Sequence, residues 1–377
     1  MIRAPFRATT HDLIDLSPLR ADNGTGLDGV SLGSLHRGRN FVFDPFDAYR
    51  SGLVTGPNMV ILGRIGSGKS AAVKMMLRRA LLGGASVAVL DPKGEYTPLA
   101  RQCHGQIFTL GDAGWFDIRS GSRQEDVRVL CALLSLARGH ALSDVEAMTV
   151  ESLWRESNAE TQTRPMKALL ELSQRNGDIS IASTLHRFVD GDLGGLIDGH
   201  GEPQSVTSTI SVLNLERWWG TDALAAVSML AWVIAERTLA QGRKGRYLVA
   251  DEAWSLLDAH ASLMRLRGSL KLARASGTSH ILVLHRLADL EAVGDVGSRH
   301  YAAALSLLRD CDTHLVFQTS EGDVGALAKE FHLTDREQRY VTALPRGAAL
   351  VRYGPHRSIV RFQPTREDLI DTDRAMR

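Results

Sequence analysis

Cysteine is scarce in this chain of 377 residues, and the few cysteines are not paired. Cys103, Cys131 and Cys311 lie far apart and form no CxxC motif, so we expect neither a disulfide framework nor a zinc knuckle. The chain also has no Ser-His-Asp arrangement and no paired carboxylates typical of glycosidases. These absences favour a protein of a reducing compartment, the cytoplasm, whose chemistry depends on other residues.

Long hydrophobic runs and an excess of one charge are missing as well. The longest apolar run, 223–235, is interrupted by Ser228 and is shorter than the ~20 residues that span a membrane. The 44 basic and 43 acidic residues leave a net charge of +1, so composition does not indicate general binding to nucleic acids. A hydrophobic fraction of 44% and a charged fraction of 23% are typical of a globular protein. At roughly 150 residues per domain, the length suggests about two domains.

Apolar segments of strand length recur along the chain and alternate with helical segments. They lie at 59–62, 86–90, 106–110, 209–215, 246–250, 280–284 and 313–318. Strands that are apolar throughout and separated by helices are typical of a parallel sheet covered on both faces. We therefore predict an α/β fold with a mainly parallel sheet.

Two stretches depart from this alternation. Residues 1–40 are rich in Gly, Asp, Arg and Ser with little periodicity, so we expect an N-terminal arm there. Residues 122–201 show helical patterns in place of strands, which predicts an all-α insertion domain. The α/β domain is then expected to comprise residues 41–121 and 202–377. Near its end, strand-like segments flank Gly354-Pro355 and predict a hairpin.

The most specific motif follows the first of these strands directly and satisfies G-x-x-x-x-G-K-[ST]. Its residues are Gly63, Arg64, Ile65, Gly66, Ser67, Gly68, Lys69 and Ser70. In this motif the backbone N–H groups surround a phosphate, the lysine reaches the β- and γ-phosphates, and the serine hydroxyl binds Mg²⁺. A helical segment follows and ends at Gly83-Gly84, so its positive end points at the same place. The sequence therefore predicts ATP and Mg²⁺ as cofactors.

A pair of acidic residues, Asp251 and Glu252, follows the strand at 246–250. At that edge of the sheet Asp251 is expected to hold Mg²⁺, and Glu252 to orient and deprotonate the attacking water. Alternatively the pair caps the helix that begins near residue 253, and both roles can hold together. Beside a phosphate loop the pair predicts an ATPase, which converts ATP and water to ADP and phosphate.

Several segments together resemble the HerA/FtsK superfamily of ring-shaped pumping ATPases, and most closely the type IV secretion ATPases of the VirB/TraC conjugative-transfer class. They are FVFDPFDAYRSG (41–52), the phosphate loop, LDPKGEY (90–96), DEAWSLL (251–257) and LPRGAALVRYG (344–354). The resemblance covers about residues 40–370. Coupling proteins, which feed DNA to the channel, share the D-P-K-G-E segment, whereas DEAWSLL favours the secretion branch.

The resemblance implies a RecA-like P-loop NTPase core and an active homo-hexamer with ATP sites between subunits. It implies further that membrane-embedded subunits of a secretion channel are the partners, and that the protein works at the cytoplasmic face of the membrane. Members of this class generally carry a large N-terminal domain, whereas the motor region here begins within the first few dozen residues. We therefore expect docking to the membrane complex by another route.

Two further residues are assigned roles through the resemblance. After the strand at 280–284 the family has a Gln that senses the γ-phosphate, and this chain has His285, which is either a replacement sensor or an ordinary surface or core histidine. Arg274 matches the arginine that the neighbouring subunit contributes to the ATP site. The alternative for Arg274 is an exposed helix face that it shares with Arg267 and Lys271.

Two other features have open interpretations. Asp91, Lys93 and Glu95 in LDPKGEY either couple the ATP state to a neighbouring subunit or form a tight turn with exposed charges. The pair Trp218-Trp219 either anchors a partner or a base, or packs between the helical and motor domains.

The predicted function is an ATP-hydrolysing motor that energises a type IV secretion or conjugative DNA-transfer apparatus. A second possibility is a DNA translocase or coupling protein that pumps DNA through a hexameric ring, for which the balanced net charge is unfavourable. A third is an ATP-binding assembly platform with little hydrolysis, which His285 suggests and the acidic pair disfavours.

Overall fold

The computed structural model describes residues 27–35, 38–111, 116–159, 164–198, 208–242, 245–257, 260–293 and 298–368. Its centre is a sheet of eleven strands in the order β2-β1-β11-β10-β9-β3-β8-β7-β4-β6-β5. The strands are β1 (Val30–Leu35), β2 (Asn40–Phe43), β3 (Met59–Leu62), β4 (Ser86–Asp91), β5 (Gln106–Thr109), β6 (Ile210–Asn214), β7 (Arg246–Ala250), β8 (Thr278–Leu284), β9 (Thr313–Phe317), β10 (Ala348–Tyr353) and β11 (His356–Phe362).

All strands from β9 to β5 in this order run parallel, and the remaining strands pair antiparallel at one side of the sheet. Each apolar segment of the sequence forms a strand within two residues of its predicted ends. The predicted hairpin is also present, because β10 and β11 pair from Ala348 and Arg361 to Tyr353 and His356. The α/β fold with a mainly parallel sheet is therefore confirmed.

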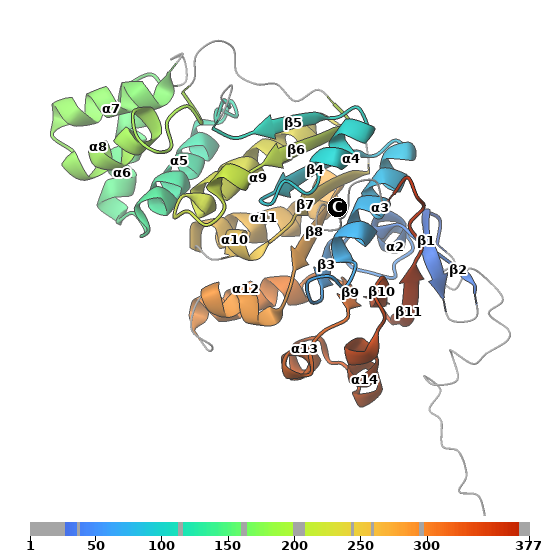
Figure 1. Cartoon of the computed structure of the whole chain (residues 1–377). Coiled ribbons are helices and arrows are strands. Elements are labelled where there is room, and N and C mark those ends of the chain that lie inside the picture. The colour runs from blue at the N-terminus through green and yellow to red at the C-terminus, as the bar shows by residue number, and fades with distance from the viewer. Residues whose placement is uncertain are drawn as a thin grey trace, which may run out of the picture.

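Helices cover both faces of the sheet (Figure 1). The α-helices are α2 (Pro45–Arg50), α3 (Lys69–Leu82), α4 (Thr97–Gln102), α5 (Arg123–Arg138), α6 (Asp144–Glu156), α7 (Pro165–Asn176), α8 (Ile179–Val189), α9 (Leu224–Ala240), α10 (Trp254–Leu257), α11 (His260–Ser276), α12 (Arg299–Arg309), α13 (Glu321–Phe331) and α14 (Asp335–Ala343), and the 3-10 helices are η1 (Glu216–Trp218) and η2 (Leu287–Val293). Within the described ranges, no helix is long and apolar enough to cross a membrane.

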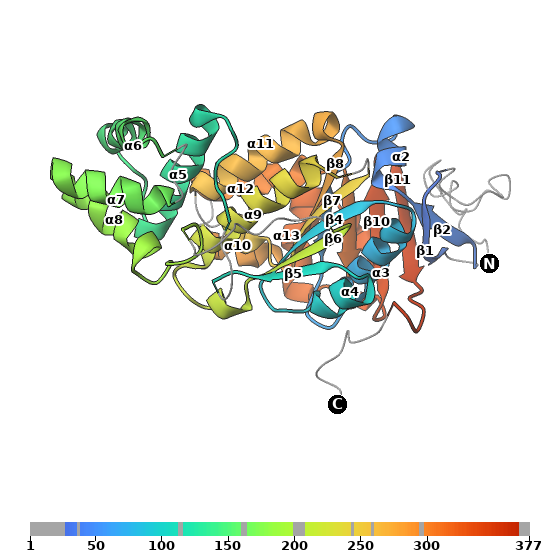
Figure 2. The same ribbon diagram turned by 90° about the horizontal axis from the view of Figure 1, so that it is seen from above.

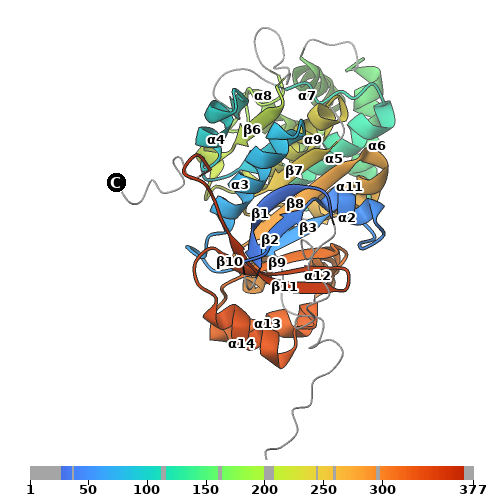
Figure 3. The same ribbon diagram turned by 90° about the vertical axis from the view of Figure 1, so that its right-hand side faces the viewer.

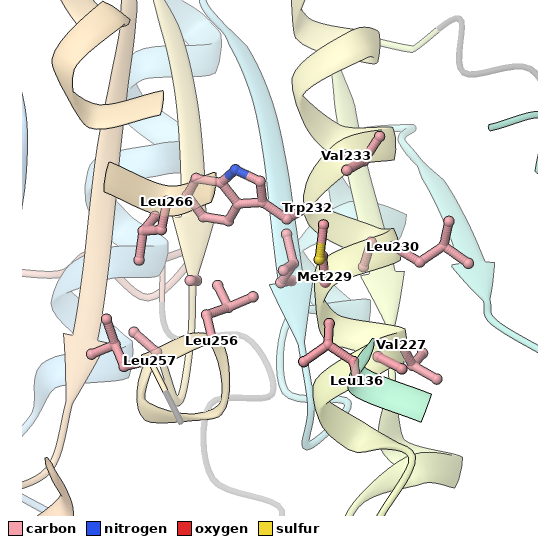
Figure 4. Close-up of a cluster of buried hydrophobic side chains, with 14 of the residues drawn as sticks. Leu136, Val227, Met229, Leu230, Trp232, Val233, Leu256, Leu257 and Leu266 are labelled. Atoms are coloured by element: carbon pink, nitrogen blue, oxygen red, sulfur yellow. The ribbon is translucent and has the colours of Figure 1, made fainter. Parts of the chain in front are cut away.

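The two faces of the sheet have separate cores, because successive side chains of a strand point to opposite faces. In β3, Met59 and Ile61 join a cluster with α3 and α4, whereas Val60 and Leu62 join a larger cluster with α5, α9 and α11. Figure 4 shows part of the larger cluster, where Leu136 of α5 lies beside Val227 and Leu230 of α9. The inner parallel strands are thus buried on both faces, which explains their apolar sequences, whereas β5 at the edge of the sheet is only partly buried.

Helices α5 to α8 gather at one end of the molecule, and β1 and β2 lie at the other (Figures 1 and 2). Local sequence signals define these helices: Ser143 and Glu146 form a capping box at the start of α6, and Gly139 ends α5 in a left-handed conformation. Helix α5 packs against α9 and α11, so the predicted helical insertion shares the larger core with the α/β part.

The expectation of an arm up to residue 40 differs from the structure in one respect. Residues 30–35 form β1, which pairs with β11 through Gly33 and Phe362. This pairing continues the sheet beyond the hairpin of β10 and β11 (Figure 3). Leu32 of β1 is buried. The pairing partner lies more than three hundred residues away in the sequence, so local periodicity does not reveal it. The arm residues 1–26 lie outside the described residues.

Candidate functional site

The predicted site residues come together where the parallel strands end. In the sheet, β8 lies between β3 and β7, and β4 follows β7. The carboxyl ends of parallel strands meet at one edge of the sheet. The segments that follow these four strands therefore lie side by side: the phosphate loop after β3, His285 after β8, Asp251-Glu252 after β7 and Lys93 after β4.

The phosphate loop joins β3 to α3, and three of its glycines have positive φ angles. They are Gly63 at 150°, Gly66 at 77° and Gly68 at 104°. A Cβ atom at Gly63 would lie 2.5 Å from Cβ of Phe317, and one at Gly68 would lie 2.9 Å from the backbone nitrogen of Gly347. At Gly66 no atom would lie within 4 Å of a Cβ. Glycine is therefore required at 63 and 68 by close packing as well as by backbone conformation.

Backbone hydrogen bonds fix the loop to two later segments of the chain. The N–H of Arg64 donates to the carbonyl of Gln318 at 2.8 Å, and the N–H of Gly347 donates to the carbonyl of Ser67 at 2.8 Å. The segments that follow β9 and precede β10 thus hold the loop in place. The second segment includes LPRG of the C-terminal motif. The sequence pattern links this motif to the family, and the structure shows that it contacts the phosphate loop.

Lys69 lies inside the loop and is buried. Its ammonium group donates to the carbonyls of Gly63 and Arg64 and lies 2.9 Å from Nδ1 of His285. Burial lowers the pKa of Lys69 to about 8, although the charges of Asp251 and Glu252 act in the opposite direction.

Glu252 is buried, with 3% of it exposed, and its carboxylate accepts hydrogen bonds from three donors. Its Oε1 accepts from Lys93 and from Nε2 of His285 at 2.5 Å, and its Oε2 accepts from Nε1 of Trp254 at 2.9 Å. Burial raises the pKa of Glu252, but the hydrogen bonds from His285 and Lys93 outweigh it and lower the pKa to about 2. The backbone of Glu252 has a positive φ of 53°, a conformation that strains a non-glycine residue.

His285 connects the phosphate loop to the acidic pair. An ammonium group only donates hydrogen bonds, so Nδ1 of His285 accepts from Lys69 and Nε2 carries the hydrogen that goes to Glu252. The imidazole therefore makes one donated and one accepted hydrogen bond. The side chain of His285 thus lies within the site, between Lys69 and Glu252, rather than in the core or on a remote surface.

Asp251 is buried beside Glu252 and close to two other carboxylates. Burial, and then the charges of Glu252, Glu95 and Asp91, raise the pKa of Asp251 to about 7. Such a carboxylate is stabilised by a divalent cation. Among the described residues no group of three or more His, Cys, Asp or Glu side chains could hold a metal. The single carboxylate of Asp251 nevertheless fits Mg²⁺, because this ion takes one or two protein ligands and completes its shell with water and phosphate oxygens.

Ser67 also fits a bound phosphate. Its Oγ is buried and has no hydrogen-bond partner within the part of the chain that is described, which is a cost unless a ligand supplies an acceptor. Gly68 is the last residue before α3, and the first turn of α3 begins with Lys69 followed by Ser70. The free N–H groups and the dipole of a helix start favour an anion.

Arg274 is not brought to this cluster within one chain. It is exposed on α11, two residues before that helix ends, and β8 begins at Thr278. His285 follows the other end of β8, and seven residues of strand span about 20 Å. Arg267 and Lys271 are exposed on the same face, opposite buried Leu263, Leu266 and Leu270. The helix face predicted as the alternative is present.

Other residues of the site were missed or left open by the sequence. Trp254 follows Glu252 by two residues, and this spacing within DEAW is the signal that points to it. The sequence predicts for Lys93 either coupling to a neighbouring subunit or a place in a tight turn, and its contact with Glu252 depends on the pairing of β4 with β7. The two adjacent tryptophans separate: Trp218 is buried and donates to the carbonyl of Leu110, whereas Trp219 is 39% exposed.

The fold and the phosphate loop are those of a P-loop NTPase with a RecA-like α/β core. Residues 56–190 match the family model of the central domain of helicase HerA. VirB4 of Thermoanaerobacter pseudethanolicus superposes with a TM-score of 0.77 and 22% identity, covering 90% of this chain and 98% of that chain. No curated protein is similar enough to count as a match.

A bacterial conjugative coupling protein, TrwB, superposes with a TM-score of 0.60 and 16% identity over 89% of this chain and 90% of that chain. TrwB in complex with ADP and Mg²⁺ gives the same TM-score at 15% identity, over 90% of each chain. At such identities the superpositions show the fold. The predicted resemblance to the HerA/FtsK superfamily is confirmed over residues 56–190 by the family model, and the superpositions show that the fold is that of VirB4 and TrwB.

Proposed function

We propose that this protein is an ATP-hydrolysing motor that energises a type IV secretion or conjugative DNA-transfer apparatus. The observation that carries the proposal is the linked set Lys69–His285–Glu252, which joins the phosphate loop to a buried carboxylate. A protein that only binds nucleotide has no need of a charged carboxylate held at that place.

Each residue has a role in hydrolysis under this proposal. The loop N–H groups and Lys69 bind the phosphates, and Ser70 with Asp251 holds Mg²⁺, which supplies charge neutralisation at the phosphates when bound. Glu252 orients the attacking water and accepts its proton. His285 keeps Glu252 and Lys69 at a fixed separation, in the position where the family has its sensor Gln.

The biological setting rests on the structural neighbours. VirB4 shares the fold over nearly its whole length, and TrwB is described as a conjugative coupling protein. By analogy with them, this chain would assemble into a homo-hexameric ring and work at the cytoplasmic face of the membrane beside the subunits of the secretion channel. The insertion at 122–201 and the α/β parts at 41–121 and 202–377 would form its two domains.

Steady-state ATP hydrolysis by the purified protein tests the proposal. We expect Glu252→Gln to bind ATP but to hydrolyse it at least ~10²-fold more slowly, because the general base is lost. Lys69→Ala should lose nucleotide binding, measured by fluorescence of a labelled ATP analogue. Lys167→Met, a change on the exposed surface of α7, serves as the control. Wild-type turnover in Glu252→Gln would contradict the assignment of Glu252.

A DNA-pumping coupling protein is the second candidate, which the superposition with TrwB favours. The same assay with single- and double-stranded DNA separates the two. Turnover that rises with protein concentration and is insensitive to DNA supports a secretion motor that assembles into a ring. Strong stimulation by DNA that falls steeply with added salt supports the coupling protein.

A further inference from the structure

We propose that Lys93 is a positioning residue for Glu252 and that the exposed ring of Trp219 holds Lys93 in place. The inference rests on the proposed function, in which Glu252 is the base. It concerns a residue outside the phosphate loop and outside the acidic pair, and it gives the D-P-K-G-E segment a role within one subunit.

The contacts form a closed set around Glu252. The ammonium of Lys93 pairs with Oε1 of Glu252 and lies 5.0 Å from the ring centroid of Trp219. Trp219 packs edge-on against Trp254, with ring centroids 5.9 Å apart. Trp254 in turn donates to Oε2 of Glu252. Both oxygens of the carboxylate are thus tied, directly or through one intermediate, to the same aromatic pair.

The backbone that carries Lys93 is itself fixed. Asp91 is fully buried, and its two oxygens accept from the N–H groups of Glu95 and Tyr96 at 2.9 and 2.8 Å. Gly94, next to Lys93, has a φ of 70°, and a Cβ there would lie 2.5 Å from a carboxylate oxygen of Glu216. The turn after β4 is therefore held by side-chain and steric contacts, so Lys93 projects from a rigid base.

The arrangement restrains a carboxylate that would otherwise have alternatives. A glutamate side chain has several rotatable bonds, and a productive geometry depends on sub-ångström placement. An ammonium over an aromatic face is attracted by the electrons of the ring, which keeps Lys93 beside Glu252 rather than in solvent. Loss of Lys93 leaves Oε1 with His285 alone, so that two donors in place of three restrain the carboxylate.

Replacing Lys93 tests the positioning role. We expect Lys93→Met to lower kcat at least ~10-fold with little change in KM for ATP, because the base is misplaced while the phosphate loop is intact. Lys93→Arg keeps the charge and the stacking and should recover most of kcat. Trp219→Ala should lower kcat in the same direction, and Trp219→Phe should not. A kcat of Lys93→Met within twofold of that of wild type would overturn the proposal.

A measurement on the protein without nucleotide tests the contact separately from activity. Lys93→Met removes the cation from the face of Trp219, so tryptophan emission should change. The same substitution in a Trp219→Phe background should change emission less, because only Trp254, which contacts Glu252 and not Lys93, then reports on the site. An equal change in both backgrounds would show that Lys93 does not contact Trp219 and would overturn the proposal.

The role of Glu252 as base and the positioning role of Lys93 can be tested separately. If Glu252→Gln keeps full turnover, the proposed role of Glu252 fails, whatever the emission shows. If Glu252→Gln is inactive but Lys93→Met is not impaired, only the positioning role fails. Lys167→Met, which removes an exposed lysine of α7, is the matched control for loss of a lysine charge.

Discussion

Neighbouring carboxylates at the site have opposite environments. Glu252 is surrounded by donors that lower its pKa to about 2, whereas burial among other acids raises the pKa of Asp251 to about 7. Divergent pKa values in adjacent groups are typical of sites where the groups have different tasks. Under the proposed function, Glu252 is the charged base and Asp251 is the carboxylate that would hold Mg²⁺.

A buried histidine, His280, and a partly buried one, His314, lie outside the site and make stability depend on pH. His280 of β8 stacks on Trp232 and lies 3.0 Å from Oδ1 of Asn58, and burial lowers its pKa to about 3. Burial, and then the charge of Arg352, lower the pKa of His314 to about 4. In the unfolded chain both titrate near 6.5. The unfolded state therefore binds more protons below that pH, and stability falls as pH decreases.

We expect the free energy of unfolding to be insensitive to these groups above about pH 6.5. Below it, each histidine should remove up to about 1.4 kcal/mol per pH unit, down to the pH of its folded pKa. Urea unfolding at several pH values between 7 and 4.5 measures this. Carboxylates contribute in the same range, so the informative quantity is the difference between wild type and His280→Gln. A difference that does not vary with pH would contradict this prediction.

At the scale of elements, the β10–β11 hairpin depends on one glycine. Gly354 has a φ of 51° in the two-residue turn between Tyr353 and His356, the conformation that tight hairpins require. A Cβ there would lie 1.9 Å from the backbone oxygen of Leu53. The hairpin joins β9 to β1 through the sheet, so its register affects both.

Gly354→Ala should therefore destabilise the protein by more than ~2 kcal/mol, through backbone strain and a clash with main chain that cannot move easily. Gly139→Ala is the matched control. Gly139 also has a positive φ, of 78°, but no atom lies within 4 Å of the added Cβ, so only about 1 kcal/mol is expected. Chemical denaturation of both variants measures the difference, and equal losses would mean that the contact with Leu53 is unimportant.

At the scale of the whole molecule, the separation of Arg274 from the phosphate loop decides how it can act. The start of β8, near Arg274, and the end of β8, near His285, are at opposite edges of the sheet. Arg274 can therefore complete an ATP site only in a neighbouring subunit, as an arginine supplied across a ring interface does.

Mixing two inactive variants tests this. If Arg274 acts across the interface, Arg274→Ala and Lys69→Ala are each inactive alone. In mixed rings, an interface is complete when the Arg274→Ala subunit supplies the loop and the Lys69→Ala subunit supplies the arginine. Equal mixing makes about a quarter of the interfaces complete, so ATPase activity should reappear. Activity that stays absent on mixing would contradict a role across the interface, and an Arg274→Ala variant that is fully active alone would assign Arg274 to an ordinary exposed helix face.

The sequence by itself determined the parts of this protein that are local. Apolar runs specified the inner strands because these are buried on both faces, and glycines marked the phosphate loop because glycine adopts positive φ angles without strain. The acidic pair was found because it follows such a strand. The capped helices at 122–201 were found because their signals lie within a few residues.

Only the tertiary structure decided what depends on distant residues. The pairing of β1 with β11 and the hydrogen bond of Gly347 to the phosphate loop join segments that no local pattern connects. The contacts of Lys93 and His285 with Glu252 likewise require the order of β4, β7 and β8 in the sheet. That order is set by packing and chain crossovers, so the neighbours of the carboxylate, and with them its pKa, are properties of the folded molecule.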